Sequence, residues 1–289
     1  MVEENERPKS PAIWRGPRGD LSLARAALMG VLNVTPDSFS DGGQFIRVES
    51  AVAHGRAMLG RGARILDVGG ESSRPGAQPV SEAEERARVV PVIEGLRRVT
   101  EAWITIDTVK PSVAAAAMAA GADGINDITG LRDPEMREVA IASGAAVVIM
   151  HMQGTPRTMQ ERPGYLDVVA EVRAFLQSQV ERAVQEGMER ERIALDPGIG
   201  FGKTLEHNLA LLRALPVLVA LGQPVLLGVS RKSFLGRVLQ LPEAGDRDAA
   251  TAALSCWARA RGVLLHRVHD VQRNEEALRM GEAIAGPLR

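Results

Sequence analysis

Short runs rich in valine, isoleucine and leucine recur along the chain and alternate with longer segments of helical character. The runs are apolar on both faces, which is typical of parallel strands in a sheet that helices cover. The pattern predicts eight strands, at residues 27–33, 63–68, 103–107, 124–127, 146–151, 192–196, 225–229 and 263–268.

Three of the intervening segments begin with residues that typically start helices. Ser81 followed by Glu84 has the pattern of a capping box, in which each side chain satisfies a backbone N–H at the helix start. Asp133 precedes Pro134, which suits an N-cap followed by proline at the first helical position. Pro111 opens an alanine-rich segment in the same way. We therefore predict helices that begin at these three places.

Strands that alternate with helices fit either a closed (β/α)8 barrel or an open, doubly wound sheet. Eight strands is the number that closes a barrel. An open sheet would carry a glycine-rich turn after its first strand, whereas residues 33–43 read NVTPDSFSDGG, a long polar loop. We predict a single-domain (β/α)8 TIM barrel over residues 27–289. Residues 1–26 are expected to be an N-terminal extension, with a hairpin over the barrel's N-terminal mouth.

The composition excludes several classes of function. The 35 basic and 36 acidic side chains nearly cancel, and aromatic residues make up 3% of the chain, so we expect no nucleic-acid partner. Cys256 is the only cysteine, which rules out an intrachain disulfide and suggests a buried structural thiol. The start of the chain has no signal-peptide core and no apolar stretch could span a membrane. We expect a cytoplasmic protein with no membrane partner.

Polar side chains gather where the predicted strands end. In barrel enzymes the carboxyl ends of the strands and the loops that follow them form the active site. A single residue of this kind is often only a helix or turn cap, but a polar group at every strand end predicts a binding site. The groups are Asn33, residues 71–74, Asp107, Asn126, Asp127, His151, Asp196, residues 230–233, Arg267 and His269.

The chemistry of these groups indicates the kind of ligand. Asp107, Asn126 and Asp196 suit a flat heterocycle with several N–H groups, because a carboxylate accepts two parallel hydrogen bonds from such an edge. Lys232 can donate to a ring carbonyl or ring nitrogen. Positive charge for a phosphate or carboxylate comes from Arg74, Arg267 and His269. The sequence therefore predicts a nitrogen heterocycle that is attached to an anion.

The residues also bear on metal binding and on nucleotide binding. No pair of histidines has the spacing of metal ligands, so any metal should be Mg²⁺ bound mainly by substrate phosphate and one protein oxygen. Residues 196–204, DPGIGFGKT, look like a phosphate-binding loop, but Pro197 stands where the first glycine is required. A dinucleotide fingerprint fails as well, at Lys203. We expect the three glycines to let the backbone approach a bound ring and Phe201 to pack on it.

From about Met29 onward the chain resembles the dihydropteroate synthase family. The resemblance rests on motifs whose order and spacing match along nearly the whole chain. They are MGVLNVTPDSFSDGG (29–43), DVGGESSRPGA (67–77), TIDTVKP (105–111), GINDITG (124–130), MHMQGTP (150–156), LDPGIGFGKT (195–204), GVSRKSFLG (228–236) and RVHDV (267–271).

The resemblance implies a transferase of folate biosynthesis that is a target of sulfonamides. It would condense 6-hydroxymethyl-7,8-dihydropterin diphosphate with 4-aminobenzoate to give 7,8-dihydropteroate and pyrophosphate, by an SN1-like substitution. It also implies Mg²⁺, bound at Asn33, and a homodimer, for which residues 246–261 around Trp257 are a candidate interface.

The family's site residues carry over motif by motif. The implied catalytic residues are Asp107, Lys232, Arg267 and His269. The implied pterin-binding residues are Asp107, Asn126, Met150, Asp196, Gly200 and Lys232. The implied diphosphate-binding residues are Asn33, Arg74, Arg267 and His269. The implied 4-aminobenzoate-binding residues are Phe39, Ser73, Arg74, Pro75, Phe201, Lys232 and Ser233.

One departure from the family pattern concerns Ser73, where the family usually has threonine. We expect the hydroxyl's hydrogen bond to survive and the packing to loosen. The loops at residues 35–43 and 71–76 are rich in glycine and proline, and we expect them to close over bound ligands. A methyltetrahydrofolate-binding methyltransferase barrel would not need the Asn33 loop or the basic residues around Lys232 and Arg267. A paralogue that binds pterin without turnover should have lost some of them.

Overall fold

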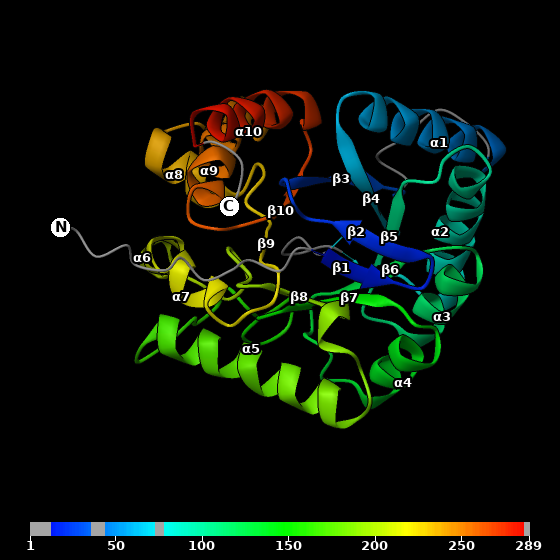
Figure 1. Ribbon diagram of the computed structural model, residues 1–289, viewed down its shortest axis with the longest axis horizontal. Coiled ribbons are helices and arrows are strands. Elements are labelled where there is room, and N and C mark those ends of the chain that lie inside the picture. The colour runs from blue at the N-terminus through cyan, green and yellow to red at the C-terminus, as the bar shows by residue number, and fades with distance from the viewer. Residues whose placement is uncertain (1–12, 36–43, 73–77, 286–289) are drawn as a thin grey trace.

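Eight parallel strands form a closed barrel with helices around it (Figure 1), as the sequence predicts. The computed structural model describes residues 13–35, 44–72 and 78–285. The strands pair in the order β8-β7-β6-β5-β4-β3-β10-β9, and a bridge between Leu195 and Val225 closes β8 onto β9. The barrel strands are β3 (Ala27–Asn33), β4 (Ala63–Gly69), β5 (Trp103–Asp107), β6 (Gly124–Asp127), β7 (Ala146–Met150), β8 (Ile193–Asp196), β9 (Leu226–Leu227) and β10 (Leu265–Val268).

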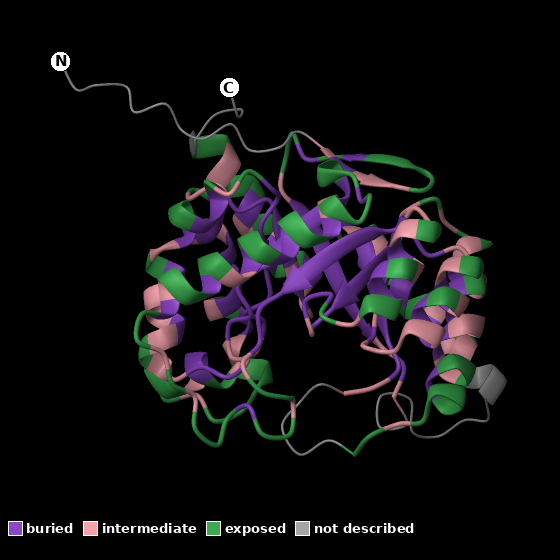
Figure 2. Cartoon of the chain, turned by 90° about the horizontal axis from the view of Figure 1, so that it is seen from below, coloured by how far each residue is buried: buried purple, intermediate pink, exposed green. Residues whose placement is uncertain are grey.

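The predicted strand ranges are confirmed to within one residue at each end, except at β9 and β10. β10 begins at Leu265 rather than at residue 263, and β9 is shorter than residues 225–229. Val225 contributes only the closing bridge there. The helices of the described ranges cover the outside of the barrel, and the strands between them are almost wholly buried (Figure 2). These helices are α1 (Gln44–Gly60), α2 (Glu82–Arg97), α3 (Pro111–Ala119), α4 (Pro134–Ala142), α5 (Val168–Gln185), α6 (Leu205–Arg213), α7 (Leu215–Val219), α8 (Ser233–Leu239), α9 (Asp248–Arg259) and α10 (Val271–Ala285).

The predicted helix starts are present, with one difference at α2. Ser81 Oγ accepts a hydrogen bond from the backbone N–H of Glu84 at 3.2 Å, and Asp133 accepts one from Glu135 N at 2.9 Å. The second half of the expected capping box is missing, because the Glu84 carboxylate pairs with Arg88 one turn further on. An arginine at this spacing offers the carboxylate a charged partner in place of a backbone N–H.

The expected N-terminal hairpin is formed by β1 (Ile13–Gly16) and β2 (Gly19–Ser22), and it crosses the barrel in Figure 1. Trp14 of β1 is fully buried and packs against Trp103 at the start of β5, with ring centroids 5.3 Å apart. Its Nε1–H donates to the backbone oxygen of Arg192 at 3.0 Å, just before β8. The hairpin therefore plugs the N-terminal end of the barrel, opposite to the predicted site.

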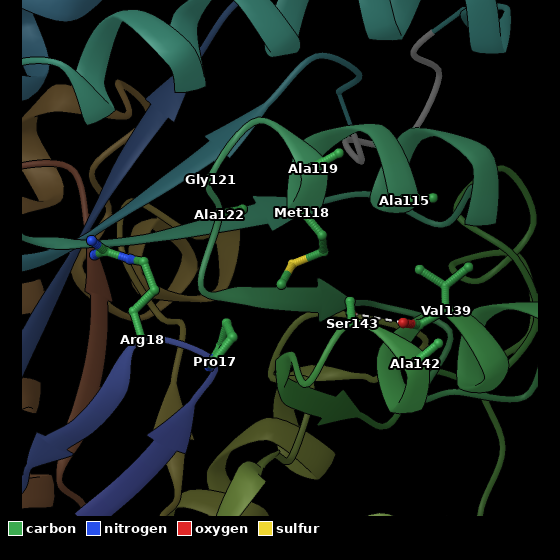
Figure 3. Close-up of a pocket in the computed structure, with 10 residues that line it drawn as sticks. All are labelled: Pro17, Arg18, Ala115, Met118, Ala119, Gly121, Ala122, Val139, Ala142 and Ser143. Atoms are coloured by element: carbon green, nitrogen blue, oxygen red, sulfur yellow. Dashed lines mark hydrogen bonds between the residues drawn. The ribbon is translucent and has the colours of Figure 1, made fainter.

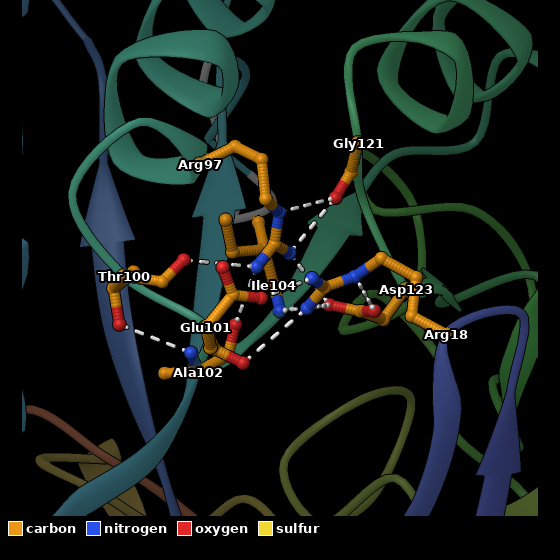
Figure 4. Close-up of polar contacts among 8 residues, drawn as sticks. All are labelled: Arg18, Arg97, Thr100, Glu101, Ala102, Ile104, Gly121 and Asp123. Atoms are coloured by element: carbon orange, nitrogen blue, oxygen red, sulfur yellow. Dashed lines mark hydrogen bonds and ion pairs between the residues drawn. The ribbon is translucent and has the colours of Figure 1, made fainter.

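A cluster of charges fixes the hairpin to this end of the barrel (Figure 4). Asp123 is fully buried and pairs with two guanidinium groups, Arg18 of the hairpin turn and Arg97 of α2, each at 2.7 Å. The backbone N–H of Ile104 donates to the same carboxylate at 2.8 Å. A buried carboxylate needs such full pairing to offset its desolvation. We interpret this cluster as structural.

The same end of the barrel carries a cavity of about 560 Å³ between the hairpin turn, α3 and α4 (Figure 3). Small apolar side chains such as Ala115 and Ala142 line most of it. Its one charged lining residue is Arg18, which Asp123 and Glu101 already engage. The cavity thus lacks the groups that polar catalysis needs.

Cys256 lies on α9 and is half-buried, which differs from the expected fully buried thiol. The close packing of α9 on α10 explains its position, because a Cβ at Gly281 of α10 would come within 2.7 Å of the Cys256 sulfur. The thiol therefore fills space beside a glycine, at the edge of the helix pair.

Candidate active site

A three-residue ion network lies at the carboxyl ends of β4, β5 and β10. Arg267 of β10 donates from Nε to Asp67 at 2.5 Å and from Nη2 to Asp107 at 2.6 Å. These two bonds leave Nη1 directed elsewhere, so the guanidinium can hold both carboxylates and still meet a ligand. The sequence placed Asp107 and Arg267 in separate subsites, and the structure brings them into direct contact.

Asp67 anchors this network and was missed as a site residue. It is fully buried and also accepts hydrogen bonds from Thr105 Oγ1 at 2.5 Å and Asn126 Nδ2 at 3.1 Å. The bond from Asn126 fixes that amide's orientation and turns its oxygen away from Asp67, as an acceptor. A carboxylate inside the apolar run of β4 was the available signal, since a buried charge requires a partner.

Two carboxylates share one guanidinium here, and the pKa of one of them, Asp107, is shifted. Burial raises the pKa of Asp107 to about 7, and the charge of Asp67 adds to the effect although Arg267 opposes it. Burial lowers the pKa of Arg267, but Asp67 and Asp107 outweigh it and the net shift is upward. Asp107 therefore takes up a proton more readily than an exposed carboxylate does.

A second group of predicted residues meets where β8 and β9 end. An ideal Cβ on Gly228 would lie 3.6 Å from Asp196 Oδ2, 3.9 Å from Arg267 Cβ and 4.0 Å from Lys232 Nζ. The absence of a side chain at Gly228 thus leaves open the space that these three residues surround. Lys232 also donates to the backbone oxygen of Ile199.

Burial shifts the pKa values of this second group toward neutrality. It raises the pKa of Asp196, which is opposed by the charge of Lys232. It lowers the pKa of Lys232 to about 8, which Asp196 opposes. The Lys232 ammonium lies 4.6 Å from the centre of the Phe201 ring. A carboxylate, an ammonium and an aromatic face therefore border one space, which suits a planar polar ring.

Two of the three glycines in the loop after β8 are required for a different reason from the one expected. Gly198, Gly200 and Gly202 all have positive φ, at 66°, 83° and 61°. A Cβ on Gly198 would lie 1.8 Å from the backbone oxygen of His151, and one on Gly202 would lie 2.7 Å from that of Gln153. The first and last glycines thus allow close packing on the loop after β7 rather than on a ligand. A Cβ on Gly200 would lie 3.1 Å from Lys232 Cδ, so this glycine faces Lys232.

Asn33 and His269 meet at the side of the mouth. Both line a polar cavity of about 580 Å³ together with Arg61 and Arg231. Ser230 orients His269, since its hydroxyl lies 2.9 Å from Nδ1 and accepts from the backbone N–H at 3.1 Å. The Asn33 oxygen and Asp107 Oδ2 both lie 3.8 Å from the Cβ position of Gly69. This polar cavity therefore adjoins the ion network.

The remaining predicted residues divide between the mouth and the undescribed loops. Met150 is buried in a small cluster with Ile128 and Met152, against which Phe201 packs. Ser233 is exposed at the start of α8, directly after Lys232. Four predicted site residues lie outside the described ranges, namely Phe39, Ser73, Arg74 and Pro75. Most of the two loops that were expected to close over ligands, residues 35–43 and 71–76, lies outside them as well.

Two polar strand-end residues have structural partners. Asp127 accepts hydrogen bonds from the backbone N–H groups of Thr129 at 2.8 Å and Leu131 at 2.9 Å, which forms the turn after β6. His151 bonds through Nδ1 to Lys203 at 3.0 Å. Asp127 is therefore a turn cap, the structural alternative that applies to any single strand-end residue.

The donor set suits a cation that takes most of its ligands from substrate and water. Within the described ranges no three histidine, cysteine or acidic side chains come together as metal ligands. Asn33 offers an amide oxygen beside the polar cavity, and one or two protein oxygens with substrate phosphates are the usual surroundings of Mg²⁺.

Comparison with known proteins identifies the family. The model of the family described as pterin binding enzyme matches residues 29–269. Dihydropteroate synthase of Escherichia coli (strain K12) is 46% identical over 265 residues, which cover 91% of this chain and 93% of that protein. No helix in the described ranges is long and apolar enough to cross a membrane.

Solved structures agree. Xanthomonas albilineans dihydropteroate synthase with 4-aminobenzoic acid matches with a TM-score of 0.90 and 44% identity, over 96% of this chain and 99% of that one. The same enzyme in complex with 7,8-dihydropteroate matches with a TM-score of 0.84 and 43% identity, over 92% and 96% of the two chains. This chain belongs to the dihydropteroate synthase family of pterin-binding enzymes.

Proposed function

We propose that this chain condenses 6-hydroxymethyl-7,8-dihydropterin diphosphate with 4-aminobenzoate, and that the mouth of the barrel carries out the reaction. The observation that carries the proposal is the joint presence of a polar space bordered by Asp196 and Lys232 and a polar cavity lined by Asn33 and His269. A pterin diphosphate needs both, side by side.

The pterin ring is proposed to lie over Gly228. Asp196 accepts from its N–H-rich edge, Asn126 presents its amide oxygen, and Lys232 donates to a ring oxygen or nitrogen. Met150 and its neighbours provide an apolar wall. Burial raises the pKa of Asp107 to about 7, and a developing positive charge on the ring favours its ionised form.

The reaction requires that pyrophosphate leaves and that an aniline nitrogen forms a bond to the exocyclic methylene carbon. The electron-rich dihydropterin can stabilise a positive charge at that carbon, so we propose a dissociative, SN1-like path. Arg267 and His269 take up charge on the leaving pyrophosphate, while Asp107 and Asp196 favour the cationic ring. An aniline is neutral at pH 7, so its attack needs no strong general base.

Asn33 is proposed to hold Mg²⁺ together with the diphosphate oxygens. Bound there, the ion would neutralise charge on the departing pyrophosphate. The 4-aminobenzoate subsite is proposed to lie between Phe201, Lys232 and Ser233 on one side and the two loops outside the described ranges on the other.

The decisive experiment measures pyrophosphate release from the pterin diphosphate. We expect release that requires both added 4-aminobenzoate and Mg²⁺. Binding of the pterin diphosphate without release would favour a paralogue that has lost turnover. No binding at all would refute the assignment of the site.

The dissociative path has its own test. Deuterium on the exocyclic methylene should slow turnover measurably, because that carbon changes hybridisation before the aniline attacks. The comparison of labelled and unlabelled pterin diphosphate at saturating 4-aminobenzoate isolates this step. An isotope effect of unity would argue for a concerted displacement.

A homodimer and a cytoplasmic location also belong to the proposal. Trp257 of α9 is half-buried beneath Arg261, whose guanidinium lies 3.5 Å from the ring, and exposed Met280 and Ile284 extend along the adjacent α10. Light scattering after gel filtration measures the mass. A monomer at micromolar concentration would contradict the dimer.

A further inference from the structure

Lys203 is a buried lysine to which the proposed reaction assigns no role. It lies in the loop after β8 and is only 3% exposed. Its Nζ lies 3.0 Å from His151 Nδ1, 3.0 Å from the backbone oxygen of Phe201 and 3.3 Å from that of His151. An ammonium carries three N–H donors, so each donor has an acceptor.

The state of His151 fits this arrangement. Burial, with the charge of Lys203 adding to it, lowers the pKa of His151 to about 3, so the imidazole is neutral and Nδ1 is free of a proton when Nε2 carries it. The ring is held at its edge by Phe175, with centroids 5.0 Å apart. His151 is therefore a fixed acceptor.

These contacts join the loops after two adjacent strands, β7 and β8. The bond to Phe201 fixes the backbone of the residue whose ring faces Lys232. The neighbouring residue Gly200 is held from outside, where its N–H donates to Asn208 at 2.7 Å and its oxygen accepts from Gln160 at 2.6 Å. Lys203 is the charged member of this set of ties.

The pKa of Lys203 lies close to neutral pH, so its charge changes in the physiological range. Burial lowers its pKa to about 7, Asp196 of β8 opposes the shift, and Lys232 before α8 adds to it. Above that pH the amine keeps two N–H donors for three acceptors. One of the acceptors in the His151–Phe201 set then loses its donor, and the tie between the loops weakens.

We propose that Lys203 is a positioning residue, whose ammonium locks the loop that carries Gly200 and Phe201 so that the Phe201 ring is preset for 4-aminobenzoate. The inference rests on the proposed function. It assigns Lys203 no contact with the reacting atoms.

The test compares K203M with a matched control, R192M. Arg192 is also a buried cation, 7% exposed, that donates to backbone oxygens of Ala145 at 3.0 Å and Ala140, but it lies at the opposite end of the barrel. We expect K203M to raise the KM for 4-aminobenzoate ~10-fold or more, with a smaller change in kcat, because a charge-assisted tie is lost. R192M should leave both constants unchanged, and K203R should recover part of the loss.

Hydrogen exchange gives a readout that does not depend on turnover. Amides of residues 198–202 should exchange faster in K203M than in the wild type, and not in R192M. Unchanged exchange and an unchanged KM in folded K203M would overturn the proposal, as would an equal KM change in R192M. A wild type that releases no pyrophosphate refutes the proposed function instead, and the exchange result still decides the role of Lys203.

If K203M does not fold, the wild type and K203R decide. In the wild type, exchange of residues 198–202, corrected for its intrinsic pH dependence, should accelerate as pH rises through about 7. In K203R the guanidinium stays charged, so this acceleration should be absent. The same pH response in both proteins would overturn the proposal.

Discussion

Replacing Asp67 by asparagine separates the contribution of its charge from that of its hydrogen bonds. The buried carboxylate has Thr105 on its Oδ1 side and the two obligatory donors Arg267 and Asn126 on its Oδ2 side. The hydroxyl of Thr105 can reverse and accept. Asparagine can therefore place its NH₂ toward Thr105 and keep its oxygen toward Arg267. D67N removes the charge and keeps the hydrogen bonds.

The expected cost follows from this difference. Hydrogen bonds to charged groups contribute about 1–2 kcal/mol more than neutral ones, so the free energy of unfolding should fall by about that amount in D67N. Both variants lose the Asp67–Arg267 ion pair, and Arg267 keeps Asp107 as its charged partner. D67A also leaves three donors without an acceptor, so about 3–5 kcal/mol is expected for it. Denaturant unfolding of both variants measures the two values. Equal losses would refute the proposed rearrangement at Thr105.

The same variant should alter the pH dependence. The Asp67 charge helps to raise the pKa of Asp107, so D67N should lower that pKa from about 7. If the ionised form of Asp107 supports the reaction, wild-type kcat/KM falls below pH 7 and this acid limb moves to lower pH in D67N. The activity of D67N relative to wild type should thus increase as pH falls from 8 to about 6. A constant ratio would contradict the role given to Asp107.

The free energy of unfolding should depend on pH in the opposite direction to the activity. The folded pKa of Asp107 lies above its ordinary value of 3.8, so its contribution to stability is fully present below that pH and is lost as pH rises through about 7. D67N should flatten this part of the stability curve.

Three further outcomes are expected. D196A should abolish pterin binding measured by calorimetry, because the buried carboxylate faces the ring position, and normal turnover in D196A would remove Asp196 from the site. Wild-type kcat/KM should fall as pH rises through about 8, because Lys232 loses its proton there. K232M should have low activity and should not show this alkaline decrease. If the decrease persists in K232M, another group causes it. W14A should lower the free energy of unfolding by about 3–5 kcal/mol with unchanged kcat/KM, since Trp14 fills the far end of the barrel, and a loss of activity in the folded variant would contradict that separation.

The architecture could be predicted because the strand pattern is local. Runs that are apolar on both faces mark buried parallel strands, and a barrel brings all their carboxyl ends to one mouth. Asp107, Asp196 and Lys232 all lie beside Arg267, and Asn126 is joined to it through Asp67. The hairpin around Trp14 was predictable in kind but not in its contacts with Trp103 and Asp123.

The partners of each side chain could not be predicted in the same way. Asp67 and Lys203 look like ordinary motif residues in the sequence, and their importance depends on contacts across strands, to Arg267 and His151. The three glycines after β8 are special positions, as the sequence indicates, but two of them have a different reason from the expected one. A positive φ and close contact with the adjacent loop explain Gly198 and Gly202, and sequence alone did not indicate that neighbour.

The fate of the amine nitrogen of 4-aminobenzoate distinguishes condensation from hydrolysis. The protein is incubated with the pterin diphosphate, Mg²⁺ and 4-aminobenzoate labelled with ¹⁵N at its amine, and the products are analysed by mass spectrometry. Condensation gives 7,8-dihydropteroate that contains the label, in equal amount to the released pyrophosphate. Pyrophosphate released without labelled dihydropteroate would show hydrolysis in place of condensation, and the proposed function would be wrong.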